Sequence, residues 1–257
     1  MPHAPAIFTT CVQAIRDGEL IEREDKADKE FHFQNWFKKR LESLALHFDS
    51  PGRNSYPDFS LVKYAEGYEL KGLGYPGREA NYDCNSQVPL GEHNGRKIYY
   101  VFGRYPAKPD GNRYPVLDLV LCDGAFLNAN SEYVHKNKSF RGFGSYGDIL
   151  VRDRKMYVAP TPFALADGTA HRRTLILQED EEAGADLVEV GTLTRREVDQ
   201  IVVAYSFDLT TNELQTTLVP NPNAGKERTF KAYRLKGDPM EPVTLQWPRG
   251  AGGTVVR

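Results

Sequence analysis

The sequence predicts a mixed α/β fold in which a central mixed β-sheet is flanked by helices and followed by a β-rich C-terminal extension. Three observations favour this class: one amphipathic helix pattern, several strand patterns separated by turn signals, and a last third rich in β-branched and aromatic residues. At 257 residues the chain can bury a core without disulfides. We assign residues 1–170 to the core and residues 171–257 to a β-rich segment packed on it.

The first regular element that the sequence predicts is a helix within residues 28–48. Its apolar residues recur at steps of three and four, which gives the helix one apolar face. The turn-forming residues 49–57 then end it. The residues of the apolar face are Phe33, Trp36, Phe37, Leu41 and Leu44.

Strands are predicted after this helix. Residues 58–64 and 67–73 form a hairpin that turns at residues 65–67, and two further strands cover residues 96–105 and 114–124. Asn94-Gly95, just before the third strand, is a strong hairpin signal. For the region after Thr194 the sequence allows a capped helix, because Thr194 and Glu197 fit a capping box, or a hairpin, which the β-branched and aromatic residues favour.

The composition is that of an ordinary soluble protein. Hydrophobic residues make up 40% and charged residues 26%, and the net charge is −2. The N-terminus has no secretory leader pattern, and no segment is long and apolar enough to cross a membrane. Cys11, Cys84 and Cys122 are odd in number and widely spaced, which favours free thiols. We therefore expect a cytoplasmic protein.

Charged residues cluster on the predicted hairpin. Residues two apart in a strand point the same way, so Glu69 and Lys71 share a face and Leu70 points to the core. The antiparallel hairpin brings Asp58 beside Glu69 and Lys71. Two adjacent carboxylates resist ionising together unless a cation lies between them, and Mg²⁺ prefers such oxygen ligands. Together with the lysine, these residues suit metal-dependent phosphodiester hydrolysis.

These residues resemble the active-site signature of the PD-(D/E)XK nucleases. The signature is carried by "PDF" at 57–59 and "YELKG" at 68–72, with ten residues between Asp58 and Glu69. Within this superfamily, "NYDCNSQVPLG", "YYVFGRY", "LCDGAFLNA" and "GFGSYGD" make the chain most similar to a type II restriction endonuclease over residues 25–160. The resemblance implies a restriction-endonuclease-like sheet and a catalytic, DNA-binding core.

The resemblance also implies roles for the clustered residues. Asp58, Glu69 and the backbone carbonyl of Leu70 would bind Mg²⁺, and Lys71 would position the attacking water. Many members of the family add an acid from the preceding helix. The matching position here is Glu30, and the alternatives on the same helix are Gln34 and Glu42.

Polar and basic residues that follow the cluster could contact DNA. Arginine pairs with guanine, asparagine and glutamine pair with adenine, and an acid accepts from cytosine, while basic residues meet phosphates. The first predicted group, just past the cluster, is Arg78, Asn81, Asp83, Asn85, Ser86 and Gln87. The second group, in and beside a basic stretch, is Lys136, Lys138, Arg141, Ser145 and Tyr146.

The expected function is therefore sequence-specific, Mg²⁺-dependent cleavage of double-stranded DNA to 5′-phosphate and 3′-hydroxyl ends. A symmetric site cut on both strands implies a homodimer, and a restriction enzyme implies a DNA methyltransferase gene nearby. Two alternatives stay open: a repair or recombination nuclease of the same fold that reads DNA structure, and a β-rich binding module without catalysis. Two glycine patterns, at 72–77 and 142–147, lack the strand–helix context of a dinucleotide site.

Overall fold

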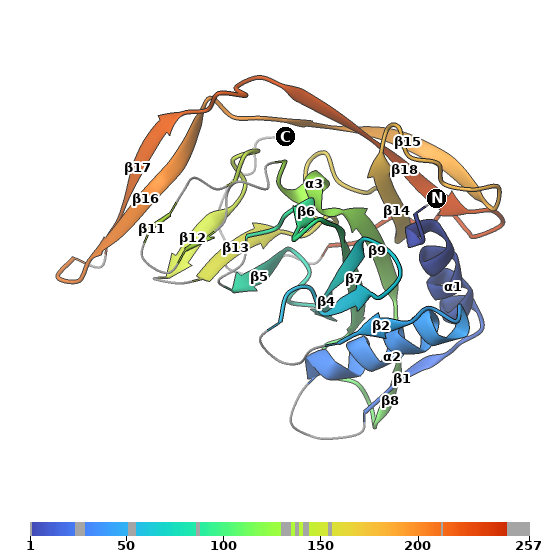
Figure 1. The fold of residues 1–257 in the computed structure, drawn as a ribbon. Coiled ribbons are helices and arrows are strands. Elements are labelled where there is room, and N and C mark those ends of the chain that lie inside the picture. The colour runs from blue at the N-terminus through green and yellow to red at the C-terminus, as the bar shows by residue number, and fades with distance from the viewer. Residues whose placement is uncertain are drawn as a thin grey trace.

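The protein is described from a computed structural model, which is mixed α/β and rich in strands (Figure 1). The structure describes residues 2–23, 29–50, 55–85, 88–129, 135–136, 139–140, 144–153, 156–211 and 213–245. The helices are α1 (Ala4–Arg16), α2 (Lys29–Ser43) and α3 (Gly124–Leu127). The strands are β1 (Leu20–Glu22), β2 (Phe48–Asp49), β3 (Phe59–Leu61), β4 (Glu66–Tyr75), β5 (Asn81–Asn85), β6 (Glu92–His93), β7 (Arg96–Pro106), β8 (Arg113–Pro115), β9 (Asp118–Asp123), β10 (His135–Lys136), β11 (Ser139–Phe140), β12 (Leu150–Asp153), β13 (Met156–Pro160), β14 (Arg173–Gln178), β15 (Leu187–Arg196), β16 (Gln200–Asp208), β17 (Glu213–Pro220) and β18 (Glu227–Leu235).

A mixed nine-stranded sheet forms the centre of the fold. Its order is β15-β18-β14-β9-β7-β4-β3-β2, and β6 pairs with β7 at one end. β4 is parallel to β7 and β9 is parallel to β14, whereas β3–β4, β7–β9 and β14–β18 are antiparallel. The central strands are apolar because both faces of the sheet are covered.

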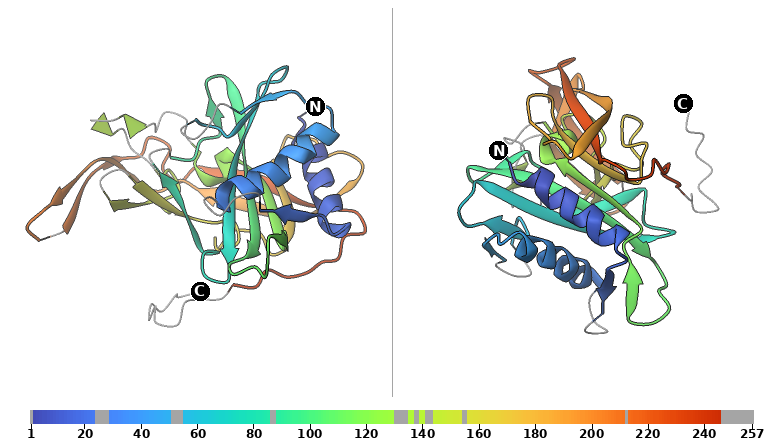
Figure 2. Two further views of the ribbon diagram at one scale, coloured as in Figure 1. Left: turned by 90° about the horizontal axis from the view of Figure 1, so that it is seen from below. Right: turned by 90° about the vertical axis from the view of Figure 1, so that its right-hand side faces the viewer.

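Helices α1 and α2 cover one face of this sheet (Figure 2). Ile7 and Phe8 of α1 and Phe37 of α2 are fully buried in a cluster that also contains Leu70 of β4 and Val101 of β7. The apolar face predicted for α2 is thus the face that packs on the sheet. The structure also has α1, whose two-turn apolar stripe was not among the predicted elements.

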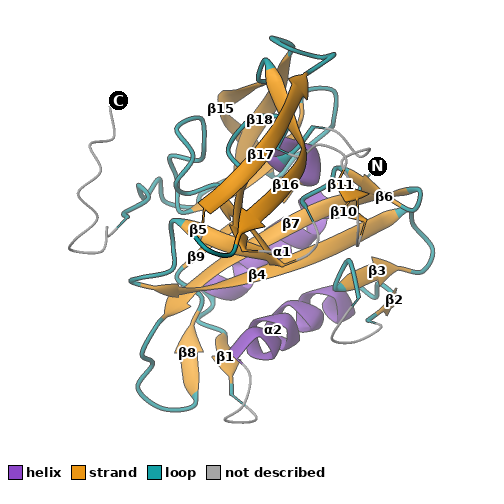
Figure 3. Ribbon diagram, turned by 90° about the vertical axis from the view of Figure 1, so that its left-hand side faces the viewer, coloured by secondary structure: helices purple, strands orange, loops and turns teal. Residues whose placement is uncertain are grey.

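A second sheet, of order β12-β13-β5, covers part of the other face (Figure 1), and Figure 3 shows β5 on the side of β4 that is away from α2. Tyr82 and Cys84 of β5 and Tyr157 of β13 are buried against Tyr100 and Phe102 of β7. The central strands therefore lie between a helical layer and a β layer. Side chains of β4 that point away from the helices point toward this β layer.

Glycine lets α2 approach the sheet closely. A Cβ at Gly103 of β7 would lie 2.2 Å from Cζ of Phe33, and one at Gly72 of β4 would lie 3.0 Å from Cε1 of Tyr105. Phe33 therefore occupies space that any larger residue at Gly103 would take. This contact fixes the first half of α2 over β4 and β7. β4 runs to Tyr75, two residues beyond the predicted end of this strand at residue 73.

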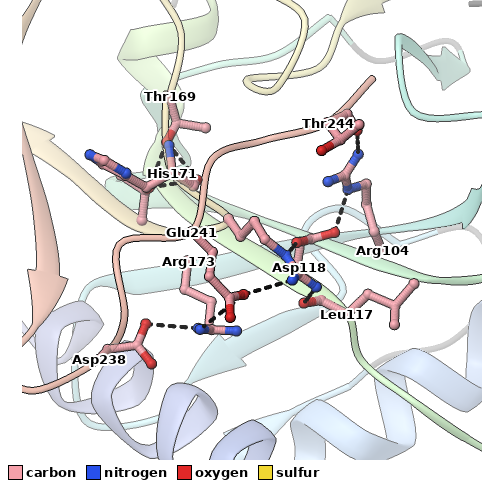
Figure 4. Close-up of polar contacts among 11 residues, drawn as sticks. Arg104, Leu117, Asp118, Thr169, His171, Arg173, Asp238, Glu241 and Thr244 are labelled. Carbon is pink, nitrogen blue, oxygen red and sulfur yellow. Dashed lines mark hydrogen bonds and ion pairs between the residues drawn. The ribbon is translucent and has the colours of Figure 1, made fainter. Parts of the chain in front are cut away.

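A network of ion pairs around the buried Asp118 joins the C-terminal segment to the sheet (Figure 4). Arg104 of β7 and Asp118 of β9 are each 2% exposed, and Nε of Arg104 donates to Oδ2 of Asp118 at 2.6 Å. Arg172 also donates to Asp118 and to Glu241, and Nη1 of Arg104 donates to the carbonyl of Thr244 at 2.8 Å. Charges with so little solvent exposure are tolerated because each has partners.

Strands from residues 171–257 complete the central sheet. β14 pairs with β9 and β18 pairs with β14, so these strands share the core of residues 1–170. β16 and β17 form the hairpin that the sequence favoured over a capped helix. Thr194 lies in strand β15, which excludes the helical alternative. In the described residues, no helix combines the length and apolar character that crossing a membrane requires.

Candidate active site

The candidate site lies where β3 and β4 separate. Phe59 pairs with Tyr68 and Ser60 with Gly67, and this register places Asp58 opposite Glu69. β3 begins at Phe59, so among the described residues β4 has no neighbouring strand on that side from Glu69 onward. The separation frees the edge of β4 for side-chain contacts.

Asp58 occupies this edge and binds the backbone of β4. Its Oδ2 accepts a hydrogen bond of 2.7 Å from the N–H of Leu70, and its Oδ1 accepts one of 3.0 Å from Nε2 of Gln34 on α2. The N–H and carbonyl of one strand residue point to the same side. The Leu70 carbonyl therefore points toward the Asp58 side of β4, as a backbone ligand would need.

Glu69 and Lys71 lie on the same face of β4, as predicted. Nζ of Lys71 donates to Oε1 of Glu69 at 2.7 Å, and the two side chains are 12% and 11% exposed. Leu70 between them is fully buried on the helical face. The hairpin thus gathers two carboxylates and one ammonium group, although its turn covers residues 62–65 rather than 65–67.

The electrostatic environment keeps Lys71 charged. Burial alone would lower the pKa of this ammonium, but the ion pair with Glu69 and the nearby Asp58 carboxylate outweigh burial and hold the pKa above its usual value. Lys71 therefore stays protonated throughout the neutral range. It can donate hydrogen bonds and offset negative charge, and it cannot accept a proton from water at neutral pH.

The walls of the site come from residues that the sequence did not indicate. The Tyr56 and Tyr100 hydroxyls lie 2.8 Å apart, and Tyr100 is the β7 partner of Glu69 in the parallel register. Burial raises the pKa of the Cys84 thiol to about 12, although Lys71 nearby acts to lower it. Cys84 is therefore a neutral, apolar wall rather than a nucleophile.

One carboxylate oxygen of this site is open to a ligand. Oε2 of Glu69 is buried and has no hydrogen-bond partner among the described residues, which leaves a carboxylate oxygen available for a ligand. The described residues contain no group of three or more His, Cys, Asp and Glu side chains suited to a metal. Two carboxylates and one backbone carbonyl still suit Mg²⁺, which keeps several water ligands.

Of the three helix residues predicted as a further ligand, Gln34 is the one that contacts Asp58. Glu30 lies in the first turn of α2, and its side chain is outside the described part of the structure. Glu42 lies in the last turn, is exposed, and is 3.8 Å from Nζ of Lys38. The structure therefore brings an amide rather than Glu42 to the site.

The polar segment after β4 is partly a strand rather than a loop. Asn81, Asp83 and Asn85 alternate in β5 with the buried Tyr82 and Cys84. Asn81 is exposed and Asp83 is half-buried, whereas the Asn85 side chain is not described. Arg78 is exposed in the preceding turn. Ser86 and Gln87 lie outside the described residues.

Two of the residues predicted to meet phosphates are buried. Ser145 is fully buried, and its hydroxyl donates to Oδ1 of Asn128 at 2.9 Å. Tyr146 is 8% exposed and donates to the Ala125 carbonyl at 2.6 Å. Both hydroxyls anchor the segment at 144–149 to α3, so neither is placed to meet DNA. Lys136 is in β10 without a described side chain, and Lys138 and Arg141 lie outside the described residues.

Comparison with known proteins does not assign this chain to a family. Family models, curated proteins and solved structures were searched, and none matches this chain.

Proposed function

We propose that the protein is a Mg²⁺-dependent, sequence-specific endonuclease of double-stranded DNA, of the type II restriction class. The observation that carries the proposal is the arrangement of Asp58, Glu69 and Lys71 at the point where β3 leaves β4. A restriction-endonuclease-like form of the central sheet is part of the same proposal. The products would carry 5′-phosphate and 3′-hydroxyl ends.

Each residue has a role that its contacts support. Asp58 and Glu69, with the Leu70 carbonyl, would hold the Mg²⁺ ion, which when bound makes a water ligand more acidic and offsets phosphate charge. The Leu70 N–H and the Gln34 amide orient Asp58. Lys71, kept cationic by Glu69 and Asp58, would orient the attacking water and stabilise the negative charge that develops on the phosphate.

DNA recognition is proposed for exposed and half-buried polar residues beside the site. Cys84 of β5 lies close enough to Lys71 for the two to influence each other's charge, so β5 borders the site. Asn81 and Asp83 lie on the side of β5 opposite Cys84, where they could read adenine and cytosine, and Arg78 could read guanine. A homodimer in the cytoplasm, with a methyltransferase encoded nearby, belongs to the same proposal.

Digestion of phage DNA tests the proposed function. With Mg²⁺ the purified protein should give discrete fragments, and with excess EDTA it should give none. Restoring Mg²⁺ should restore the same fragments. Sequencing the fragment ends should show one short common sequence at every cut.

Each other outcome favours an alternative. Cleavage of branched or flapped DNA without discrete fragments from linear duplex favours a structure-reading repair nuclease. No cleavage, with stability and DNA binding unchanged by Mg²⁺, favours a binding module whose charged residues form surface ion pairs. Either result overturns the restriction-type proposal.

Gln34→Leu should lower the cleavage rate by about 10–100-fold and raise the Mg²⁺ concentration needed for half-maximal rate, because it removes the amide that orients Asp58. Single-turnover cleavage across a Mg²⁺ titration measures both effects. Gln13→Leu is the matched control, since Gln13 lies on the exposed side of α1 and its side-chain amide donates to Oδ1 of Asp17, far from the site in the sequence. A rate unchanged in Gln34→Leu would remove this residue from the site.

A further inference from the structure

The hairpin of β16 and β17, called here the β-arm (residues 200–220), forms a sheet of its own. Within the described part of the chain, β17 pairs with β16 alone. Figure 1 shows the β-arm extending away from the helices, with β17 outside and β16 between it and β11. Figure 2 shows the same extension from below. The outer edge of β17 is therefore open.

The edge of β17 lacks the usual protection against pairing. Natural edge strands carry lysine, proline or a bulge that prevents association with another strand. β17 has no lysine, its one proline is its last residue, Pro220, and the bulge of this hairpin lies in β16. An isolated two-stranded ribbon is also only marginally stable in water. Both facts favour a further strand on this edge.

The charge and apolar surface of the β-arm favour a protein partner. Residues 200–220 contain Asp208 and Glu213 and no lysine or arginine, so they offer nothing to attract a phosphate backbone. Leu209, Leu214 and Leu218 are 72%, 40% and 48% exposed. Leu214 and Leu218 lie on the same face of β17 as Thr216, since they are two residues apart on either side.

The sequence of β17 is self-complementary about Thr216. In antiparallel pairing of two β17 strands centred there, Leu214 faces Leu218 of the second copy, and Gln215 faces Thr217 of the second copy. At the centre, leucine then meets leucine and glutamine meets threonine, with no like charges opposed; at the end of the strand, Glu213 faces Val219 of the second copy. Centring the pairing on Thr217 would instead oppose Leu218 to Thr216 and Gln215 to Val219.

We propose that β17 pairs with β17 of a second copy of this chain, antiparallel and centred on Thr216, to form a two-fold symmetric dimer. The paired ribbons make a four-stranded sheet with closed inner edges. So short a contact buries little surface, so we expect dissociation in the micromolar range. A dimer would bring together two active sites, one for each DNA strand, and this role rests on the proposed function. The β17 pairing does not depend on that function.

Cysteine cross-linking tests the contact and its register. Residues directly opposite each other lie within disulfide reach, so Thr216→Cys should give a covalent dimer under mild oxidation. Thr217→Cys, one residue away and also exposed, should give much less, because its two copies would lie diagonally apart. The three native cysteines are buried and should not react. Equal cross-linking of both variants, or none, would overturn the register.

Sedimentation of the full chain tests the dimer without any cleavage assay. The wild type should be dimeric at tens of micromolar, and Thr216→Lys should be monomeric, because two lysines would meet at the symmetry axis. Thr211→Lys, with the same change in the exposed turn, should remain dimeric. A monomeric wild type, or a Thr216→Lys dimer, would overturn the proposal. If the wild type dimerises but does not cleave DNA, the proposed nuclease function would be overturned and the proposed β17 pairing would stand.

Discussion

Asp58→Asn is expected to lower Mg²⁺-dependent DNA cleavage by about 10³-fold or more, while the fold is kept. The asparagine oxygen can still accept from the Leu70 N–H, and its NH2 group can donate to Oε1 of Gln34 once the Gln34 amide turns over, so Asp58→Asn can keep both partners. What is lost is the negative charge that a divalent cation requires. Single-turnover cleavage of the mapped target, with circular dichroism of both proteins, measures rate and fold separately.

The control and the companion variant make this result specific. Asp49→Asn is the same change on the exposed neighbouring strand β2 and should leave the rate unaltered. Lys71→Met should lose about 10²–10³-fold, because the ammonium that Glu69 and Asp58 hold in its charged form is removed. If Asp58→Asn cleaves as fast as the wild type, the catalytic centre lies elsewhere.

The part of the site that the sequence predicts is the part built by local contacts. The sequence predicts the hairpin and the shared face of Glu69 and Lys71, but not the register: a turn at 65–67 would place Asp58 opposite Gly74, whereas the observed turn at 62–65 sets the register in the structure. That register alone places Asp58 opposite Glu69, and the two-residue repeat places Lys71 on the same face as Glu69. The helix periodicity likewise predicts α2 and its packing face.

The rest depends on pairings between distant residues, which leave no local signal. β9 and β14 are parallel neighbours although some 50 residues separate them, so a boundary at residue 170 looked natural in the sequence. The same applies to Tyr100, which reaches the site only because β7 is parallel to β4. β5 is a strand because β13 pairs with it, and its many polar residues suggested a loop.

Which polar residues are buried was the other feature that could not be predicted from the sequence. Ser145 and Tyr146 follow a basic stretch and look like surface residues, but the Asn128 side chain and the α3 carbonyls bind their hydroxyls inside the fold. Gln34 was one of three helix residues in question. Gln34 reaches Asp58 because of how α2 packs on the sheet, where Phe33 lies against Gly103, and that tertiary contact leaves no signal in the helix sequence.

The largest expected effect on stability is that of Asp118→Ala, which should lower the free energy of unfolding by about 3–5 kcal/mol. Asp118 is the carboxylate shared by Arg104 and Arg172. The guanidinium of Arg104 lies 4.7 Å from the ring centroids of both Tyr75 and Phe163, and the residue is 2% exposed. Removing Asp118 leaves a buried cation without its counter-charge. Urea denaturation measures the loss, and the melting temperature should fall by on the order of 10 °C.

Two further variants test whether the loss of stability comes from the burial of an unpaired charge or only from the loss of an ion pair. Glu241→Gln removes a carboxylate that is 40% exposed from Arg172 in the same network and should cost less than about 1 kcal/mol, because water replaces it. Asp118→Leu combined with Arg104→Met removes both buried charges and should be more stable than Asp118→Ala alone, since no charge is then left unpaired. Equal losses for Asp118→Ala and Glu241→Gln would show that Arg104 finds another partner or water when Asp118 is absent. The C-terminal segment at 241–244 would then be held by its backbone contacts, the Arg172 N–H to the Glu241 carbonyl and Val243 N–H to the Ala170 carbonyl, rather than by this buried carboxylate.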